Sequence, residues 1–191
     1  ELGIMANNIP IPEAVRQDEL GWLLQGVGYE CVYGGKWHVP EIAMLDGAHG
    51  FRTICGFDDA HLAEACGTYL GSYAQGDRSR PFCMVASFDN PHNICEWARR
   101  QVLPWGPVAD VPTGDCPSLP PNYAIPAYEP EAIRWAQAAE LRVYPVRGYS
   151  DDDWRRYRQA YFRLVEKVDA QIGRILEALR AHGLERDTLV V

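Results

Sequence analysis

The spacing of apolar positions predicts helices in four parts of the chain. The first covers Glu13–Val27 and ends at Gly28, and the second covers Ala60–Tyr73. A short helix is expected around Glu129–Glu140. The longest starts after Ser150, which can cap it together with Asp153, and ends at Gly183, and its apolar side chains keep helical spacing throughout: Tyr157, Tyr161, Leu164, Val168, Ile172, Ile175 and Leu179.

Short apolar runs between these helices predict strands. Tyr29–Tyr33 is one, Phe82–Phe88 is nearly continuous in apolar character, and Thr188–Val191 looks like the opening of a buried strand. Residues 40–56 are expected to be irregular. Because strands and helices alternate along the chain, we predict an α/β fold, with a parallel sheet and helices on both of its faces.

Prolines and aromatic residues concentrate between residues 104 and 148. This segment is too aromatic for a solvated linker, so we expect an ordered insertion packed on the body of the fold. Hydrophobic residues make up 47% of the chain, enough for a buried core, and we expect one domain over residues 1–191.

Charge and cysteine content narrow the possible functions. The formal net charge of -8, without a block of consecutive Lys or Arg, argues against nucleic acid as a partner, although a local anion site stays possible. No apolar run approaches the ~20 residues needed to cross a bilayer. The six cysteines form no C-x-x-C pair, so neither a zinc ribbon nor a small disulfide scaffold is indicated. The cysteine pattern does not indicate whether the protein works in an oxidising or a reducing compartment.

Basic side chains follow two of the predicted strands. Lys36 and His38 come after the first strand, in a turn opened by Gly34 and Gly35, and His92 comes after the second. Ligands of parallel sheets collect beyond the carboxyl ends of the strands, so these groups suit a tetrahedral oxyanion. The alternative is a solvated loop lysine and hydrogen-bonded structural histidines.

One run of sequence carries these first loop residues: Gly28–His38 reads GYECVYGGKWH. It resembles the second signature of the type I, formylglycine-dependent sulfatases, in which a G-Y segment leads through a short strand to G-K-W-H. Two later blocks follow in the family's order. Phe82–His92 is similar to its strand ending in S-x-x-x-P-H, and Tyr161–Val191 resembles its long helix followed by G-L-x-x-x-T-L-V-V.

The resemblance implies the alkaline-phosphatase superfamily fold, a calcium ion and a formylglycine nucleophile made in a C/S-x-P-x-R motif. Lys36 would match the lysine that contacts a sulfate oxygen and the formylglycine. His38 would match the histidine that hydrogen-bonds the formylglycine hydroxyl and helps eliminate sulfate, and His92 the histidine that assists the leaving group. A compact lysine charge and a proton-exchanging imidazole suit these roles.

Other parts of the family pattern are not in this sequence. The segment CPSLP at Cys116–Pro120 lacks both the residue between Cys and Pro and the arginine of C/S-x-P-x-R. The family's paired metal-binding aspartates and its D-[NH]-G segment are absent too. We therefore expect an internal fragment, truncated at both ends and inactive alone, with calcium, formylglycine and all metal ligands supplied from outside this chain.

Further polar residues have competing interpretations. Trp97 and Arg99 follow His92 and are candidate substrate-pocket residues, the alternative being a packed tryptophan and a solvated arginine. The carboxylates at 58–59 and 151–153 are interpreted as helix-start groups rather than metal ligands. His49 and His61 are expected to be surface groups.

The expected function of the parent protein is hydrolysis of organic sulfate esters. Its partner would be a small sulfate ester or a sulfated carbohydrate, with no nucleic acid or membrane. One alternative is a phosphonate or phosphodiester hydrolase of the same superfamily, and another is a non-catalytic paralogue that binds anions or glycans. Residues 1–191 would form the central part of a single sulfatase catalytic domain, and the resemblance is compatible with a secreted or periplasmic parent.

Overall fold

The computed structural model describes residues 18–37, 49–139 and 144–191. These residues form two compact units: the first contains the described residues up to Asp89 together with Ala170–Val191, and the second is Asn90–Asp169. The long helix α5, Asp151–Ala181, contributes residues to both units. Each unit is built around its own buried apolar cluster.

The first unit contains a parallel sheet with the order β2-β1-β3. Its strands are β1 (Glu30–Gly35), β2 (Arg52–Cys55) and β3 (Phe82–Ser87). β1 and β3 pair in register from Glu30 opposite Phe82 to Gly35 opposite Ser87, so both strands end at the same edge of the sheet. The predicted parallel α/β architecture is confirmed.

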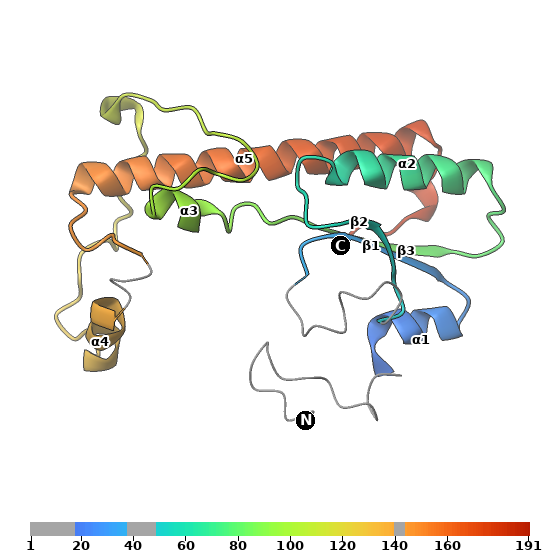
Figure 1. Ribbon diagram of the computed structural model, residues 1–191, viewed down its shortest axis with the longest axis horizontal. Coiled ribbons are helices and arrows are strands. Elements are labelled where there is room, and N and C mark those ends of the chain that lie inside the picture. Colours follow the sequence, from blue (N-terminus) through green and yellow to red (C-terminus); the bar gives the residue numbers. More distant parts are fainter. Residues whose placement is uncertain (1–17, 38–48, 140–143) are drawn as a thin grey trace. The chain divides into compact units, whose positions relative to one another are not determined.

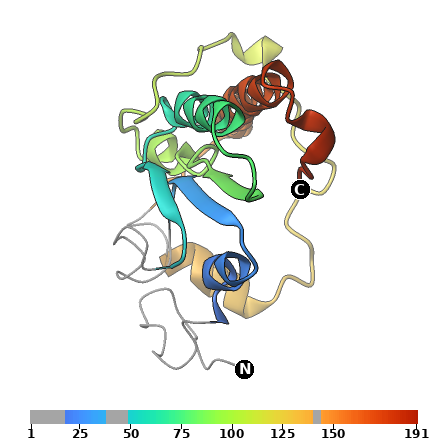
Figure 2. The same cartoon turned by 90° about the vertical axis from the view of Figure 1, so that its right-hand side faces the viewer.

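Helices cover both faces of this sheet, as Figure 2 shows. Helix α1 (Leu20–Gly26) lies on one face, where the Cys31 thiol donates to the carbonyl oxygen of Gly21 at 3.7 Å. Helix α2 (Leu62–Gln75) and the end of α5 lie on the other face, where Val32 enters the core. Neighbouring residues of β1 thus point to opposite faces, as strand geometry requires.

The core of the first unit is formed by residues with little or no exposure to solvent. They come from β1, α2, the last turns of α5 and the segment after it: Val32, Leu62, Ala63, Cys66, Tyr69, Leu70, Ile175, Leu179 and Leu184. Gly183, with a φ of +67°, allows the chain to leave α5 and bring Leu184 into this core.

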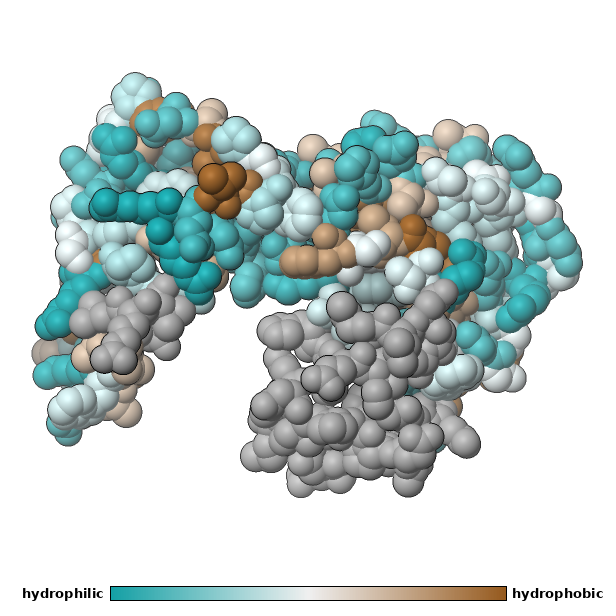
Figure 3. Space-filling view, in the orientation of Figure 1, coloured by the Kyte–Doolittle hydropathy of each residue, from teal (hydrophilic) through white to brown (hydrophobic). Residues whose placement is uncertain are grey.

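The second unit contains α3 (Ile94–Ala98), a 3₁₀ turn (Thr113–Asp115), α4 (Glu131–Ala139) and the first part of α5 (Figure 1). A smaller cluster is buried here, made of Ile94, Leu103, Ala160 and Leu164. Much of the rest is chain without regular structure. In Figure 3 this unit presents a largely hydrophilic surface with small hydrophobic areas.

The start of α5 has the predicted cap. The Ser150 hydroxyl lies 3.2 Å from the Asp153 amide, and the Asp153 carboxylate accepts from the Ser150 amide at 2.9 Å. These hydrogen bonds hold the pKa of Asp153 below its ordinary value. The acidic residues of the first turn of α5, Asp151–Asp153, are therefore helix-start groups, as expected.

Several sequence expectations need correction or lie outside the description. Gly34 and Gly35 belong to β1 and not to a turn, and β2 occupies part of the segment expected to be irregular. Thr188–Val191 is not a strand, and no described strand pairs with it. The first residues of the helix predicted over Glu13–Val27 lie outside the described residues. In the described part of the chain, no helix is both long and apolar enough to span a bilayer.

Candidate functional site

Lys36 follows β1 at the edge of the sheet where β1 and β3 both end. Its amide donates to the carbonyl oxygen of Ser87, the last residue of β3, at 2.7 Å. Gly35 makes this approach possible, because its φ is +97° and an added Cβ would lie 2.0 Å from that same oxygen. At Gly34 an added Cβ would lie 2.6 Å from Leu62 of α2. Gly35 therefore lets the backbone of Lys36 lie against β3, and Gly34 lets β1 lie close to Leu62 of α2.

The side chain of Lys36 forms a partly buried ion pair with Asp89 at this edge. Its Nζ atom donates to Oδ1 of Asp89 at 2.8 Å, and the side chains of Lys36 and Asp89 are 20% and 7% exposed. The amide of Asp89 donates in turn to Oδ1 of Asp59 at 2.7 Å, and Asp59 is 3% exposed. A charge-assisted contact in such a setting is strong and directional.

Aromatic side chains pack beside the Lys36 backbone. The Tyr33 hydroxyl donates to the carbonyl oxygen of Lys36. The Tyr33 and Trp37 rings meet edge to face with centroids 4.8 Å apart, and Trp37 stacks on His49 at 4.3 Å. His49 is therefore not the surface group that was expected: it is 6% exposed, and its Nδ1 accepts from the Phe51 amide at 3.2 Å.

Asp58 and Asp59 differ in their surroundings, although the sequence suggested one role for both. Asp58 accepts from the Ala60 amide at 2.9 Å and contacts His61 at 2.7 Å, in the turn that precedes α2. Asp59 points inward and accepts from Asp89, 30 residues away. Asp59 thus lies before α2 and also supports the Asp89 amide, and the sequence analysis did not connect Asp59 or Asp89 with Lys36.

The other site residues predicted from the sequence lie either outside the described residues or in the second unit. His38 lies outside the described residues. His92 belongs to the second unit, where its carbonyl oxygen accepts from the Cys95 amide at 3.2 Å. On α3, Trp97 packs edge to face on Tyr157 with centroids 5.8 Å apart. Arg99 pairs with Glu96 at 3.6 Å and lies over the ring of Tyr144 at 4.8 Å.

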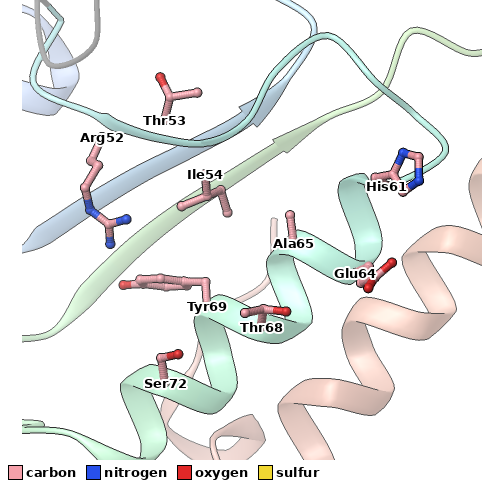
Figure 4. A pocket seen from close by; sticks show the side chains of 9 residues that line it. All are labelled: Arg52, Thr53, Ile54, His61, Glu64, Ala65, Thr68, Tyr69 and Ser72. Atoms are coloured by element: carbon pink, nitrogen blue, oxygen red, sulfur yellow. The ribbon is translucent and has the colours of Figure 1, made fainter.

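A separate pocket of about 570 Å³ opens between β2 and α2 (Figure 4). Neither Lys36 nor Asp89 lines it. Its wall combines apolar, hydroxyl and charged side chains, namely Arg52, Thr53, Ile54, His61, Glu64, Ala65, Thr68, Tyr69 and Ser72. Two of its charged groups have partners: Arg52 pairs with Glu30 at 2.9 Å, and the hydrogen bond with Asp58 raises the pKa of His61. The pocket thus offers mixed polarity and no concentration of one charge.

Metal-binding residue types do not cluster in the described part of the chain. Among residues 18–37, 49–139 and 144–191, no group of three or more His, Cys, Asp or Glu side chains is arranged to hold an ion. The described residues therefore do not fit a calcium site on their own.

Comparison with known proteins connects this site to a family. The Sulfatase family model matches residues 2–191. The chain is 27% identical, over 96% of its length, to a Delta 4,5-hexuronate-2-O-sulfatase of Bacteroides thetaiotaomicron, and 28% identical, over 81% of its length, to a choline-sulfatase of Rhizobium meliloti. It spans 39% of the first relative and 30% of the second.

The fold is shared with solved structures. A 2-O GAG sulfatase superposes with a TM-score of 0.72 at 23% identity, covering 98% of this chain and 42% of that one. This agreement extends over both units of the chain and supports the α/β architecture described above.

Proposed function

The chain belongs to the sulfatase family, and from that premise we propose that the protein carrying it hydrolyses organic sulfate esters, with Lys36 binding the sulfate group. The observation that carries the proposal is the place of Lys36. It follows the signature strand, at the sheet edge where ligands of parallel sheets collect, and its ammonium group is held by the buried Asp89.

Lys36 suits a sulfate ester on physical grounds. The ester carries a negative charge, and more charge develops on its oxygens as the S–O bond breaks. An ammonium group has three N–H donors, and among the described residues its acceptor is Asp89, so two donors can serve the anion. A donor held in place before the reaction stabilises that charge without reorganising, which is commonly the largest catalytic contribution.

His92 is the proposed proton donor for the leaving group. An imidazole ring can act as a general acid and pass a proton to the alcohol oxygen as the S–O bond breaks. Hydrolysis of R–O–SO₃⁻ by water then gives the alcohol ROH and hydrogen sulfate. His38 keeps the role that the resemblance implies, as a prediction for a residue outside the described part of the chain.

Calcium and formylglycine belong to the proposal only as groups supplied by other segments. The described residues do not fit a calcium site, and the sequence contains no C/S-x-P-x-R motif in which formylglycine could be made. No step is therefore assigned to either group here. This chain's part is to bind the sulfate through Lys36 and to move a proton through His92.

We propose a sulfated carbohydrate as the substrate class. Two similarities support this proposal. The relative that aligns over 96% of this chain is a hexuronate-2-O-sulfatase, and the solved structure with the same fold is a 2-O GAG sulfatase. The choline-sulfatase relative keeps small sulfate esters as the alternative. Trp97 and Arg99 are proposed to line the carbohydrate side of the site.

The test is a rate comparison on the full, matured protein. Wild type, Lys36→Ala and His92→Ala are assayed on an unsaturated 2-O-sulfated hexuronate disaccharide, on 4-nitrophenyl sulfate and on an aryl phosphodiester. Each substitution should lower kcat by about 10²-fold or more. Arg180→Ala is the control, because Arg180 also forms an ion pair in the first unit, at 2.9 Å with Glu185, but is 57% exposed.

Three outcomes would overturn the proposal or its assignment of Lys36. Faster turnover of the phosphodiester than of either sulfate ester would assign the protein to phosphodiester hydrolysis. Binding of the sulfated disaccharide without any turnover by the matured wild type would make it a binding protein. Undiminished activity in Lys36→Ala would remove the assigned role of Lys36.

A further inference from the structure

We propose that Asp89 is a positioning residue for Lys36, and that Asp59 fixes Asp89 in turn. This inference rests on the proposed function, because it assigns a task to the groups behind the proposed sulfate-binding lysine. Asp89 does not touch the substrate in this scheme. It acts through Lys36 by setting the direction of the ammonium group.

The three residues form a continuous chain of contacts. Asp59 accepts the Asp89 amide at 2.7 Å, and Asp89 accepts the Lys36 ammonium at 2.8 Å. Exposure rises along it, from 3% for Asp59 to 7% for the Asp89 side chain and 20% for that of Lys36. The two carboxylates thus lie inside the protein. The ammonium group of Lys36, the last of the three groups, is the one that solvent and solutes reach.

A lysine needs such support to act with fixed geometry. Its side chain has a flexible four-carbon stem and loses much rotamer freedom when ordered. Here the Lys36 amide donates to the carbonyl oxygen of Ser87, which fixes the backbone. The ammonium group at the far end of the side chain is fixed by Asp89. Holding both ends leaves the ammonium group few orientations, which is the condition for stabilising a transition state that forms at one place.

The charge of Asp89 predicts how its loss would appear in the kinetics. A carboxylate beside Lys36 weakens the attraction of the lysine for any anion in the ground state. Removing that charge should therefore leave sulfate ester binding unchanged or slightly stronger, while the loss of orientation slows the chemical step. Interactions that matter in the transition state appear in kcat and not in KM.

The experiment is a double-mutant cycle on the full, matured protein with 4-nitrophenyl sulfate. The variants are Lys36→Ala, Asp89→Asn and the double variant, with Glu185→Gln as the control for losing an exposed ion-pair carboxylate. We expect Asp89→Asn to lower kcat about tenfold with KM changed less than about threefold. In the Lys36→Ala background the same change should lower kcat less than about twofold.

Three results would overturn the inference. Equal loss of kcat from Asp89→Asn with and without Lys36 would show a structural effect. A large rise in KM at unchanged kcat would show that Asp89 serves binding, and an unchanged rate would show no role. If Lys36→Ala itself keeps full activity, the proposed function fails first, so the two failures are distinguishable.

A second variant covers the case in which Asp89→Asn does not fold. Asp59→Asn keeps the Asp89 side chain and weakens the support of its amide. It should lower kcat a few-fold in the wild-type background and have no further effect once Lys36 is alanine. Loss of kcat in both backgrounds, or in neither, would exclude Asp59 from the chain of support.

Discussion

Different interactions stabilise the interior of each of the two units. The first closes a sheet between helices and buries a contiguous apolar cluster that includes Leu62, Leu70 and Ile175. The second buries a smaller cluster around Leu164 and holds much of its irregular chain through basic side chains of α5. Apolar burial dominates in one unit, and cation-to-carbonyl hydrogen bonds are prominent in the other.

The proline content of the second unit explains this difference. Proline has no N–H and cannot continue a regular ladder, so neighbouring carbonyl groups need other donors. Basic residues on α5 provide them. Lys167 donates to the carbonyl oxygens of Trp105, Gly106 and Pro107, at 3.1, 2.7 and 2.8 Å. Arg155 donates to that of Cys116 at 2.9 Å, and Arg158 to that of Ser118.

The largest expected effect is a cavity in the core of the first unit. Leu70 and Leu164 are both fully buried, one in each unit's cluster. Leu70→Ala should cost about 4 kcal/mol of unfolding free energy and Leu164→Ala about 2.5 kcal/mol, within the ~2–5 kcal/mol range for such changes. The sheet and helices around Leu70 cannot close the cavity, whereas irregular chain near Leu164 can move toward it. Denaturant unfolding measures both values.

Amide hydrogen exchange shows which part of the protein each cavity destabilises. Leu70→Ala should speed exchange in β1 and α2, and Leu164→Ala should speed it in α3 and around Leu103. Equal losses of stability, or the same pattern of exchange in both variants, would mean that the two units do not differ in how rigidly they are packed.

The next effect tests the cation-to-carbonyl contacts. Lys167→Met keeps the length of the side chain but removes a donor to three carbonyl oxygens, and it should cost about 2 kcal/mol, in the range of hydrogen bonds to charged groups. Exchange should speed up between Leu103 and Val108. Arg174→Met is the control on the same helix, since Arg174 donates to Gln171 on the exposed surface, and it should change stability by less than about 0.5 kcal/mol.

Local patterns explain which elements could be predicted. α5 follows from helical spacing, the Ser150 cap and Gly183, all readable within one segment. β2 was missed because its four residues, Arg52–Cys55, are a short edge strand with exposed and half-buried side chains, and so lack a buried apolar pattern. α3 was missed because five residues give too few turns to show a period.

The site was predictable only in part, for the same reason. Lys36 stands in a recognisable run of sequence, but its partner Asp89 is 53 residues away. Asp59 was assigned with Asp58 because both precede a helix, and nothing local shows that one faces solvent and the other faces Asp89. Contacts between distant segments depend on the register of β1 and β3, which the sequence pattern does not specify.

A smaller effect is expected at the start of α5. The Ser150 and Asp153 side chains satisfy amides that the helix leaves without partners. Ser150→Ala should cost about 1 kcal/mol, less than either cavity and less than the loss of the Lys167 donor. Circular dichroism during thermal unfolding measures it. Ser150→Asp, which keeps an accepting side chain, should restore most of the loss, and a full loss in Ser150→Asp would show that the cap is not the cause.

The smallest effect concerns an exposed polar pair in the first unit, Asp58 and His61. Asp58 holds the pKa of His61 above its ordinary value of 6.5, and His61 holds the pKa of Asp58 below 3.8. The pair therefore stabilises the fold from the lowered pKa of Asp58 up to the raised pKa of His61, and the contribution is lost as pH rises past the latter or falls past the former. Because both groups are exposed, Asp58→Asn should scarcely change stability but should return the His61 pKa toward 6.5 in an NMR titration. Identical His61 titration curves in wild type and variant would show that the pair does not form. A clear loss of stability of Asp58→Asn at neutral pH would show that this surface contact contributes substantially to the stability of the first unit.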